Sequence, residues 1–230
     1  VNEAAKLRFM FGGKVKVPMV MRTASGAGTG AAAQHSQSLE ACLAHFPGLK
    51  VVIPSTPYDA KGLLKTAIRD DNPVMFLEQK TLYRTKGMVP EEEYSIPLGQ
   101  ADIKLAGSDC TVVTYGRMVN TCLTAAQELE KDGVRLEVID IRSLVPLDTQ
   151  TILESVKKTK HVLIVHEAVQ FCGFGAEIAG QIADSDAFYY LDAPIKRLGA
   201  KSTPIPFNPI LEAETFPTVP KIVAAVKSLL

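Results

Sequence analysis

Short apolar runs of strand length alternate with helical patterns along the whole chain, and this alternation admits only a few folds. The run at 162–165, for example, is apolar throughout. Strands without a polar face belong to parallel sheets that helices cover on both sides. The sequence therefore predicts an α/β fold built on mainly parallel sheets.

The helix that follows Thr56 has the clearest local signals in the chain. Thr56 can cap the first turn, Pro57 suits the first helical position, and Asp59 complements the helix dipole. Apolar residues then recur with the period of one buried helix face, at Ala60, Leu63, Leu64, Ala67 and Ile68. By similar reasoning we expect further helices at 2–11, 36–46, 118–131, 148–158, 175–182 and 220–230, and strands at 17–22, 49–53, 74–77, 111–115, 136–141 and 162–165.

The segment 81–105 interrupts this alternation. It contains turn residues, an acidic run at 91–93, prolines and little periodicity. Such a segment is typical of a connection between two domains. We therefore expect two α/β domains. Because the chain starts at Val1 rather than at an initiator methionine, we expect it to belong to a longer natural chain whose first domain has further leading elements.

Charge and hydropathy disfavour several classes of protein. The 25 basic and 25 acidic residues cancel, so no net field favours nucleic acid or an anionic membrane. No stretch approaches the roughly 20 apolar residues that span a bilayer, and the first residues do not resemble a secretion signal. The four cysteines, Cys42, Cys110, Cys122 and Cys172, form no C-x-x-C pair, and we expect free, core-type thiols in a reducing compartment.

The segment 26–37, with the sequence GAGTGAAAQHSQ, is the best candidate for a functional site. It follows an expected strand, and open α/β sheets place their ligands at the carboxyl ends of strands. Its small residues let the backbone approach a ligand, and His35 can donate and accept a proton near neutral pH. The spacing alone fits a flexible surface loop equally well. A dinucleotide site is rejected, because the glycines have the wrong spacing and no suitable acidic residue follows.

Two further patterns have weaker functional interpretations. The glycine cluster at 172–177 follows His166 and Glu167 and begins a helix, whose N-terminus can bind an anion. Close packing between strand and helix is the favoured interpretation of that cluster. Asp70 and Asn72 follow the end of a helix, where free carbonyl oxygens point outward. Such oxygens suit a hard cation, although a polar turn is the simpler interpretation.

Several segments together resemble one family. They are NEAAKLRFMFGG at 2–13, VPMVMRT at 17–23, GAGTGAAAQHSQS at 26–38, PGLKVVIPSTPYDAKGLLKTAIRDDNPV at 47–74 and DAPIKRLGA at 192–200. This set, which extends over essentially the whole sequence, is similar to the β subunit of the E1 component of 2-oxo acid and acetoin dehydrogenase complexes, in the transketolase-like family.

The resemblance implies a transketolase-like pyrimidine-binding domain over 1–82 with its N-terminal part missing, a linker over 83–100 and a transketolase C-terminal domain over 101–230. It also implies an α2β2 heterotetramer that holds thiamine diphosphate between its α and β subunits, with Mg²⁺ and the diphosphate bound by the α subunit. The implied activity is oxidation of pyruvate or acetoin with reductive acylation of the lipoyl domain of the E2 dihydrolipoyl acyltransferase. The implied location is the bacterial cytoplasm, or the mitochondrial matrix in a eukaryote.

In this sequence, the resemblance makes His35 the active-site histidine, which hydrogen-bonds or transfers a proton to the reaction intermediate and the lipoyl sulfur. It also implies a potassium site made of Met19, Ala67, Ile68, Asp70 and Asn72, the first three through main-chain oxygens. The family's glutamate and aromatic residue that contact the aminopyrimidine ring lie upstream of Val1, so no cofactor-binding residue is assigned within the chain.

Several functional alternatives follow from the same residues. Within the family, the segments at 9–14 and 54–64 are most similar to bacterial acetoin and pyruvate types, and branched-chain substrates are disfavoured. A second hypothesis is a truncated, non-catalytic assembly module that binds the α subunit and E2. A free-standing transketolase-type enzyme is disfavoured, because the G-D-G motif with a distant Asn, which holds the cofactor's metal, is absent from the sequence.

Overall fold

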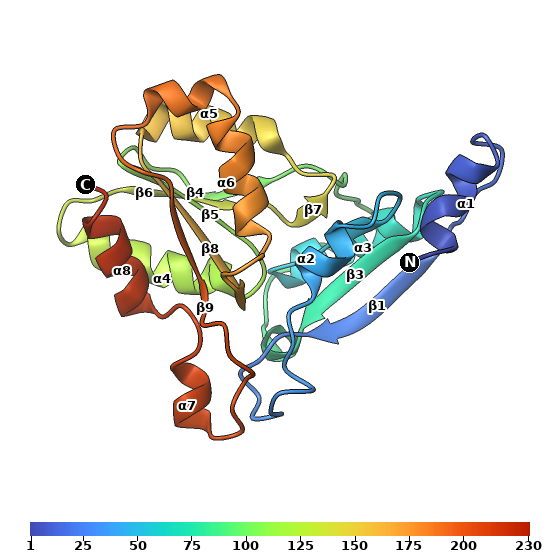
Figure 1. Cartoon of the computed structure of the whole chain (residues 1–230), viewed down its shortest axis with the longest axis horizontal. Helices are drawn as coiled ribbons and strands as arrows, with labels where there is room; N and C mark the ends of the chain where they lie inside the picture. The colour runs from blue at the N-terminus through green and yellow to red at the C-terminus, as the bar shows by residue number, and fades with distance from the viewer.

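The computed structural model describes all 230 residues, and they form two sheets that lie side by side with helices packed around them (Figure 1). The first sheet has the strand order β1-β3-β2-β7. Its strands are β1 (Val20–Ser25), β3 (Val74–Gln79), β2 (Lys50–Val52) and β7 (Ser143–Val145). The first three are mutually parallel, whereas β7 pairs antiparallel with β2.

The second sheet has the order β4-β6-β5-β8-β9. Its strands are β4 (Asp102–Leu105), β6 (Leu136–Asp140), β5 (Cys110–Thr114), β8 (Val162–Val169) and β9 (Lys196–Ala200). All are parallel except the edge strand β4, which runs antiparallel to β6. The predicted α/β class with mainly parallel sheets is therefore confirmed.

Eight α-helices accompany the sheets. They are α1 (Ala4–Met10), α2 (Glu40–Ala44), α3 (Pro57–Arg69), α4 (Met118–Glu130), α5 (Thr149–Thr159), α6 (Gly175–Ala183), α7 (Pro209–Ala213) and α8 (Val219–Lys227). The predicted cap of α3 is present, because Thr56 Oγ1 accepts from the Asp59 N–H at 3.1 Å. At the start of α5, Asp148 Oδ1 accepts from the Thr151 N–H at 3.1 Å. Both helices therefore begin where the local sequence predicts.

The alternation of strand side chains divides the second sheet between two cores. Val112 faces a core that α4 and α8 complete, whereas its neighbour Val113 faces a core that α5 and α6 complete. The second core also contains Val51 and Leu77 of the first sheet, so one continuous apolar cluster joins both sheets. This shared core fixes the carboxyl ends of the two sets of strands relative to each other.

Some elements differ from the sequence-based expectation. Strand β7 belongs to the first sheet although it follows β6 in the chain, because Arg142 turns the backbone with a φ of 50° and its carbonyl accepts the Ile53 N–H at 2.8 Å. The helix expected at 36–46 shortens to α2, because Gly26 donates its N–H to the Gln37 carbonyl at 3.0 Å and holds Gln37 outside a helix. Strands β4 and β9 and helix α7 were not predicted.

None of the helices has the length and apolar character needed to cross a bilayer.

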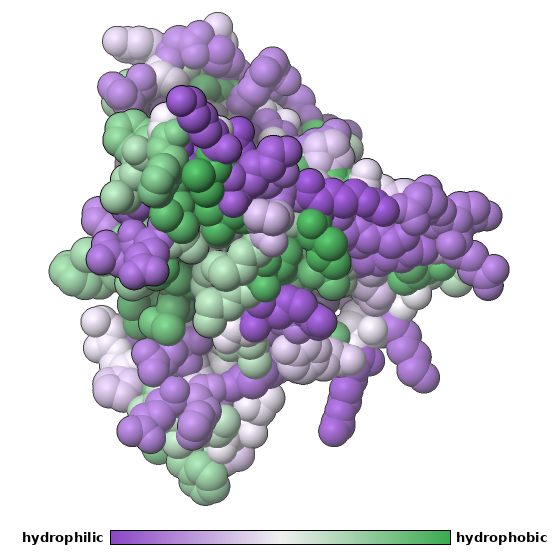
Figure 2. All heavy atoms as spheres, turned by 90° about the vertical axis from the view of Figure 1, so that its right-hand side faces the viewer, coloured by the Kyte–Doolittle hydropathy of each residue, from purple (hydrophilic) through white to green (hydrophobic).

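All four cysteines are free, but only Cys110 and Cys122 are core residues. Cys42 and Cys172 are exposed, so the expectation of four core-type thiols is wrong for these two. Apolar surface also remains on α1 and along the free edge of β1, where Phe9, Met10 and Met21 are exposed, and Figure 2 shows hydrophobic patches among hydrophilic side chains on that side of the molecule.

Candidate functional site

The glycine loop, defined as residues 26–37, lies where the carboxyl ends of strands from both sheets meet. It leaves the end of β1 and returns to its own base through the bond between the Gly26 N–H and the Gln37 carbonyl. His35 is exposed near this base, and its carbonyl accepts a hydrogen bond from Lys80 Nζ. The prediction of His35 as the catalytic residue therefore concerns an accessible imidazole on an anchored loop.

Two buried carboxylates from the second half of the chain accept the amide groups of the glycine loop. Ala27 donates its N–H to Glu167 Oε1 at 2.6 Å. Gly28 and Gly30 donate theirs to Glu212 Oε1 and Oε2 at 2.8 Å and 3.2 Å. Glu167 and Glu212 are only 3% and 4% exposed, so the loop amides supply charge-assisted hydrogen bonds that buried carboxylates need.

Glu167 is also the centre of a wider polar cluster. Its Oε2 accepts from Arg117 Nε and from Gln79 Nε2, the latter at 3.1 Å. The Gln79 Oε1 accepts the Arg117 N–H, and the Arg117 guanidinium lies 4.4 Å above the Phe216 ring. The loop cluster, as we call Gln79, Arg117, Glu167 and Glu212, thus ties the ends of β3, β5 and β8 to the glycine loop.

Three further titratable side chains are buried behind the loop. Tyr115 donates its hydroxyl hydrogen to Glu40 Oε1 at 3.0 Å, and burial raises the pKa of Glu40 to about 7. The Tyr115 ring stacks on His166, whose Nδ1 lies 3.0 Å from the Ala168 carbonyl. Burial lowers the pKa of His166 to about 4, so this imidazole is neutral at pH 7 and Nδ1 donates to the carbonyl.

The second glycine cluster serves close packing, as the favoured interpretation held. A Cβ added at Gly173 would lie 2.6 Å from His166 Cε1, and one added at Gly175 would lie 2.7 Å from His166 Nε2. The glycines therefore let the start of α6 approach the buried histidine ring. No anion is required to explain them.

The five residues of the implied potassium site come together where α3 turns into β3. The Met19 carbonyl accepts the Val74 N–H at 2.9 Å, which places the start of β1 beside this turn. The Ala67 carbonyl accepts the Asp70 N–H at 3.3 Å, whereas the carbonyls of Ile68, Asp70 and Asn72 accept no hydrogen bond. Because a carbonyl oxygen has two lone pairs, this oxygen set fits a hard cation.

The Asp70 carboxylate in the same turn already has partners. Its Oδ1 accepts from the backbone and side-chain N–H groups of Asn72, each at 2.8 Å, and its Oδ2 pairs with Lys50. These bonds lower the pKa of Asp70 against the opposing effect of burial. Asp70 therefore remains an anion near the turn at neutral pH.

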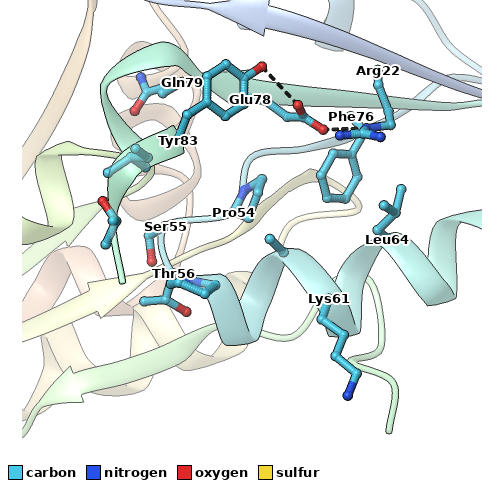
Figure 3. A pocket seen from close by; sticks show the side chains of 14 residues that line it. Arg22, Pro54, Ser55, Thr56, Lys61, Leu64, Phe76, Glu78, Gln79 and Tyr83 are labelled. Carbon is cyan, nitrogen blue, oxygen red and sulfur yellow. Dashed lines mark hydrogen bonds and ion pairs between the residues drawn. The ribbon is translucent and has the colours of Figure 1, made fainter. Parts of the chain in front are cut away.

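A separate cavity of about 340 Å³ lies between α3 and strands β1 and β3 (Figure 3), and His35 is not among its lining residues. Arg22 and Glu78, two of its charged lining residues, satisfy each other. Arg22 Nε donates to Glu78 Oε1 at 2.5 Å, and the Tyr83 hydroxyl donates to Glu78 Oε2 at 2.9 Å. Burial and the bond to Glu78 raise the pKa of Tyr83. This pocket brings no histidine or free nucleophile to the glycine loop.

The glycine loop does not fit a cradle for the phosphates of thiamine diphosphate, the cofactor that the resemblance implies. The amides of Ala27, Gly28 and Gly30 are occupied by carboxylates, and a Cβ added at Gly26 would lie 2.7 Å from Glu167 Oε1. The loop's close approaches are thus filled by the chain itself. What remains free is the exposed side with His35 and Gln34, which agrees with a diphosphate held elsewhere.

Comparisons with known proteins identify both halves of the chain. Residues 1–86 match the transketolase pyrimidine-binding domain, and residues 99–222 match the transketolase C-terminal domain. A solved split-gene transketolase, described as an inactive β4 tetramer, has the same fold with a TM-score of 0.77 at 23% identity, over 94% of this chain and 67% of that chain.

Curated relatives match over the full length of the chain. The β subunit of acetoin:2,6-dichlorophenolindophenol oxidoreductase from Bacillus subtilis is 52% identical over 100% of this chain and 67% of its own length. The β subunit of the pyruvate dehydrogenase E1 component from Rickettsia felis is 49% identical, and the β subunit of 2-oxoisovalerate dehydrogenase from Bacillus subtilis is 45% identical; each match covers 100% of this chain and 70% of the relative. The chain therefore belongs to the family of E1 β subunits of 2-oxo acid and acetoin dehydrogenase complexes.

Proposed function

We propose that the chain acts with an α subunit as a thiamine-diphosphate-dependent E1 enzyme and passes its product to the lipoyl group of an E2 acyltransferase. The observation that carries the proposal is His35, an exposed imidazole on a loop whose backbone is fixed at the carboxyl ends of strands from both sheets. Parallel α/β sheets place ligands at this edge. Thiamine diphosphate, when bound, supplies the electron sink for cleavage next to the substrate carbonyl.

The chain's own residues supply binding and proton handling at the exposed side of the glycine loop. His35 hydrogen-bonds the reacting group and exchanges a proton with the incoming lipoyl sulfur. The loop cluster holds the backbone beneath it, so that the imidazole keeps its orientation through turnover. The α subunit holds Mg²⁺ and the diphosphate, consistent with loop amides that are already occupied.

We assign the substrate to the acetoin and pyruvate class. Supporting relatives are the acetoin-oxidising and pyruvate-oxidising β subunits at 52% and 49% identity, against 45% for the 2-oxoisovalerate enzyme. The domain division into 1–82, 83–100 and 101–230 is kept as part of the proposal.

The test is His35→Ala in the chain co-purified with its α subunit, thiamine diphosphate and Mg²⁺. Turnover of acetoin and of pyruvate is followed by reduction of 2,6-dichlorophenolindophenol and by acylation of a lipoyl domain. Because general acid–base catalysis contributes about 10²–10⁴-fold, lipoyl acylation should fall by that factor while the thermal midpoint is unchanged. His45→Ala is the matched control, since His45 is also exposed but lies at the end of α2.

Near-wild-type lipoyl acylation by His35→Ala would refute the role of His35. If the assembly with the α subunit binds E2 but oxidises neither substrate, the chain is the non-catalytic assembly module instead.

We further propose that the turn after α3 binds potassium through Met19, Ala67, Ile68, Asp70 and Asn72. An ion that binds only the folded state stabilises that state. The thermal midpoint should therefore be higher in KCl than in choline chloride at equal ionic strength. Asp70→Ala should abolish this difference. Asp71→Ala is the control, because the partly exposed Asp71 carboxylate pairs with Lys16 at 2.9 Å and is not part of the implied site. An unchanged potassium response in Asp70→Ala would contradict the site.

A further inference from the structure

Residues of the second half of the chain, far away in the sequence, hold the glycine loop in place. Gly28 and Gly30 have φ values of 89° and 65°, in the left-handed region that favours glycine. Successive backbone amides in such a conformation converge on one acceptor and form an anion-binding concavity. Here the acceptor is a side chain of the same molecule, because both amides bind the Glu212 carboxylate.

Glu212 is itself held in place by the segment 201–216. The Lys201 N–H donates to the Thr215 carbonyl at 2.8 Å and closes this segment at its base. Asn208 Oδ1 caps α7 by accepting from the Ile210 N–H at 2.9 Å, and Thr215 Oγ1 donates to the Glu212 carbonyl at 2.6 Å. Phe216 packs with Ala27 of the glycine loop in a small apolar cluster. The carboxylate thus reaches the loop from a preformed support.

Glu167 anchors the other end of the same stretch of amides. It accepts the Ala27 N–H, and its remaining oxygen binds Arg117 and Gln79. Between them, the two carboxylates take up the amides of residues 27, 28 and 30, leaving the exposed part of the loop with His35 to reach outward. Both are more than nine-tenths buried and have loop amides as hydrogen-bond donors.

We propose that Glu212 and Glu167 are positioning residues, which hold the glycine loop from the C-terminal half of the chain and thereby set the orientation of His35. The inference rests on the proposed function, because it assigns the two carboxylates to the reaction through His35. Loss of either hydrogen-bonding carboxylate should let the loop sample orientations in which the imidazole misses the reacting group, and a misplacement of about 1 Å costs on the order of 10²-fold in rate.

The experiment uses Glu212→Gln in the assembled enzyme with its α subunit. The amide keeps the size of the side chain but replaces one acceptor oxygen by an NH2 group, which cannot accept the second loop N–H. Glu214→Gln is the matched control, because Glu214 lies two residues further along the same segment and is exposed. Glu167→Gln tests the second carboxylate in the same way.

The first readout is hydrogen–deuterium exchange of the peptide that contains residues 26–37, which does not depend on activity. Exchange of the loop amides should become about 10-fold faster in Glu212→Gln and stay unchanged in Glu214→Gln, at equal thermal midpoints. Unchanged exchange in Glu212→Gln would overturn the proposal. If Glu212→Gln does not fold, Glu212→Asp retains the charge with a shorter reach and should show the same acceleration to a smaller degree.

The second readout is a double-mutant cycle on kcat for lipoyl acylation. Glu212→Gln alone should lower kcat about 10–100-fold with KM for the substrate within about twofold. In the His35→Ala background it should lower kcat no further, because its effect passes through His35. If the fold reductions in kcat of the two single variants multiply in the double variant, the link to His35 would be overturned, even when the loop amides exchange faster. Full activity of His35→Ala by itself would instead refute the proposed role of His35, while the exchange measurement still reports whether the carboxylates hold the loop.

Discussion

Two buried charged clusters connect the halves of this chain, and they do so in different ways. The loop cluster of Gln79, Arg117, Glu167 and Glu212 binds a segment without regular structure. A second group, here called the β6 cluster, consists of Asp59, Lys104, Asp140 and Arg142 and joins the start of α3 to β4 and to the carboxyl end of β6. Both lie at the carboxyl ends of strands, so position in the fold does not separate them.

The difference lies in what satisfies the charges. In the β6 cluster, side chains neutralise one another: Arg142 Nη1 pairs with Asp59 Oδ1 at 3.0 Å, and Lys104 Nζ pairs with Asp59 Oδ2 at 2.9 Å. The other Arg142 nitrogens donate to the carbonyls of Gln100 and Ala101. In the loop cluster, the carboxylates are satisfied largely by backbone N–H groups, and Arg117 Nη2 is buried without an acceptor.

This contrast indicates that the β6 cluster stabilises the fold, whereas the loop cluster positions the glycine loop. A fully paired network among regular elements stabilises their arrangement and is costly to break. A network that ends on loop amides determines the conformation of a few residues. Its loss should therefore change the position of the side chains on that loop more than the free energy of unfolding. We therefore expect equal substitutions in the two clusters to have unequal consequences for stability.

The largest expected effect follows from Arg142→Met. Its side chain is 7% exposed, and its removal breaks the ion pair with the fully buried Asp59 and also leaves the carbonyls of Gln100 and Ala101 without their donor. Breaking a buried pair on one side costs about 3–5 kcal/mol, so the free energy of unfolding, measured by urea denaturation, should fall by that amount. Arg117→Met is the matched comparison and should cost about 1–2 kcal/mol, because Glu167 keeps the Ala27 and Gln79 hydrogen bonds. Equal losses in the two variants would break the distinction between the clusters.

Local signals in the sequence predicted the start of α3, which carries Asp59 of the β6 cluster, and the glycine loop that the loop cluster binds. The start of α3 was predicted from Thr56, Pro57 and Asp59, because a cap, a proline and a first-turn carboxylate act within a few residues. The glycine loop was likewise identified from a contiguous pattern, and the catalytic role of His35 stays a prediction. The family was recognised from similar stretches, and the matches to both transketolase domains confirm it.

The partners of these residues were not predicted, because they lie far away in the chain. Glu167 was noted beside His166 without a visible partner, and its partner Ala27 is 140 positions away. Glu212 is separated from Gly28 by 184 positions and lies on α7, a five-residue helix with no periodic signal. Strand β7 has only three residues, and its pairing with β2 crosses from one half of the chain to the other. Such contacts depend on the tertiary fold.

A smaller effect, on the order of 2 kcal/mol, is expected from pH and tests whether the β6 cluster is fully paired. Burial raises the pKa of Asp140 to about 7, despite its bond from Ser55 and the nearby Lys104. The folded state therefore binds a proton that the unfolded state releases near pH 4, and this contribution to stability is lost as pH rises through 7. Because Asp140→Asn stays neutral in both states, its advantage in unfolding free energy over wild type should grow by about 2 kcal/mol from pH 5 to pH 8.

Comparing Asp140→Asn with wild type isolates the titration of Asp140 from that of the other groups that titrate in this range. Glu40, whose pKa burial also raises to about 7, lowers the stability of both proteins as pH rises. His166 acts in the opposite direction, because burial lowers its pKa to about 4 and the unfolded state binds the extra proton. Both contributions cancel in the difference between variant and wild type. A difference in unfolding free energy that stays constant from pH 5 to pH 8 would mean that Lys104 and Arg142 keep Asp140 ionised throughout, and the β6 cluster would then be a fully charged network.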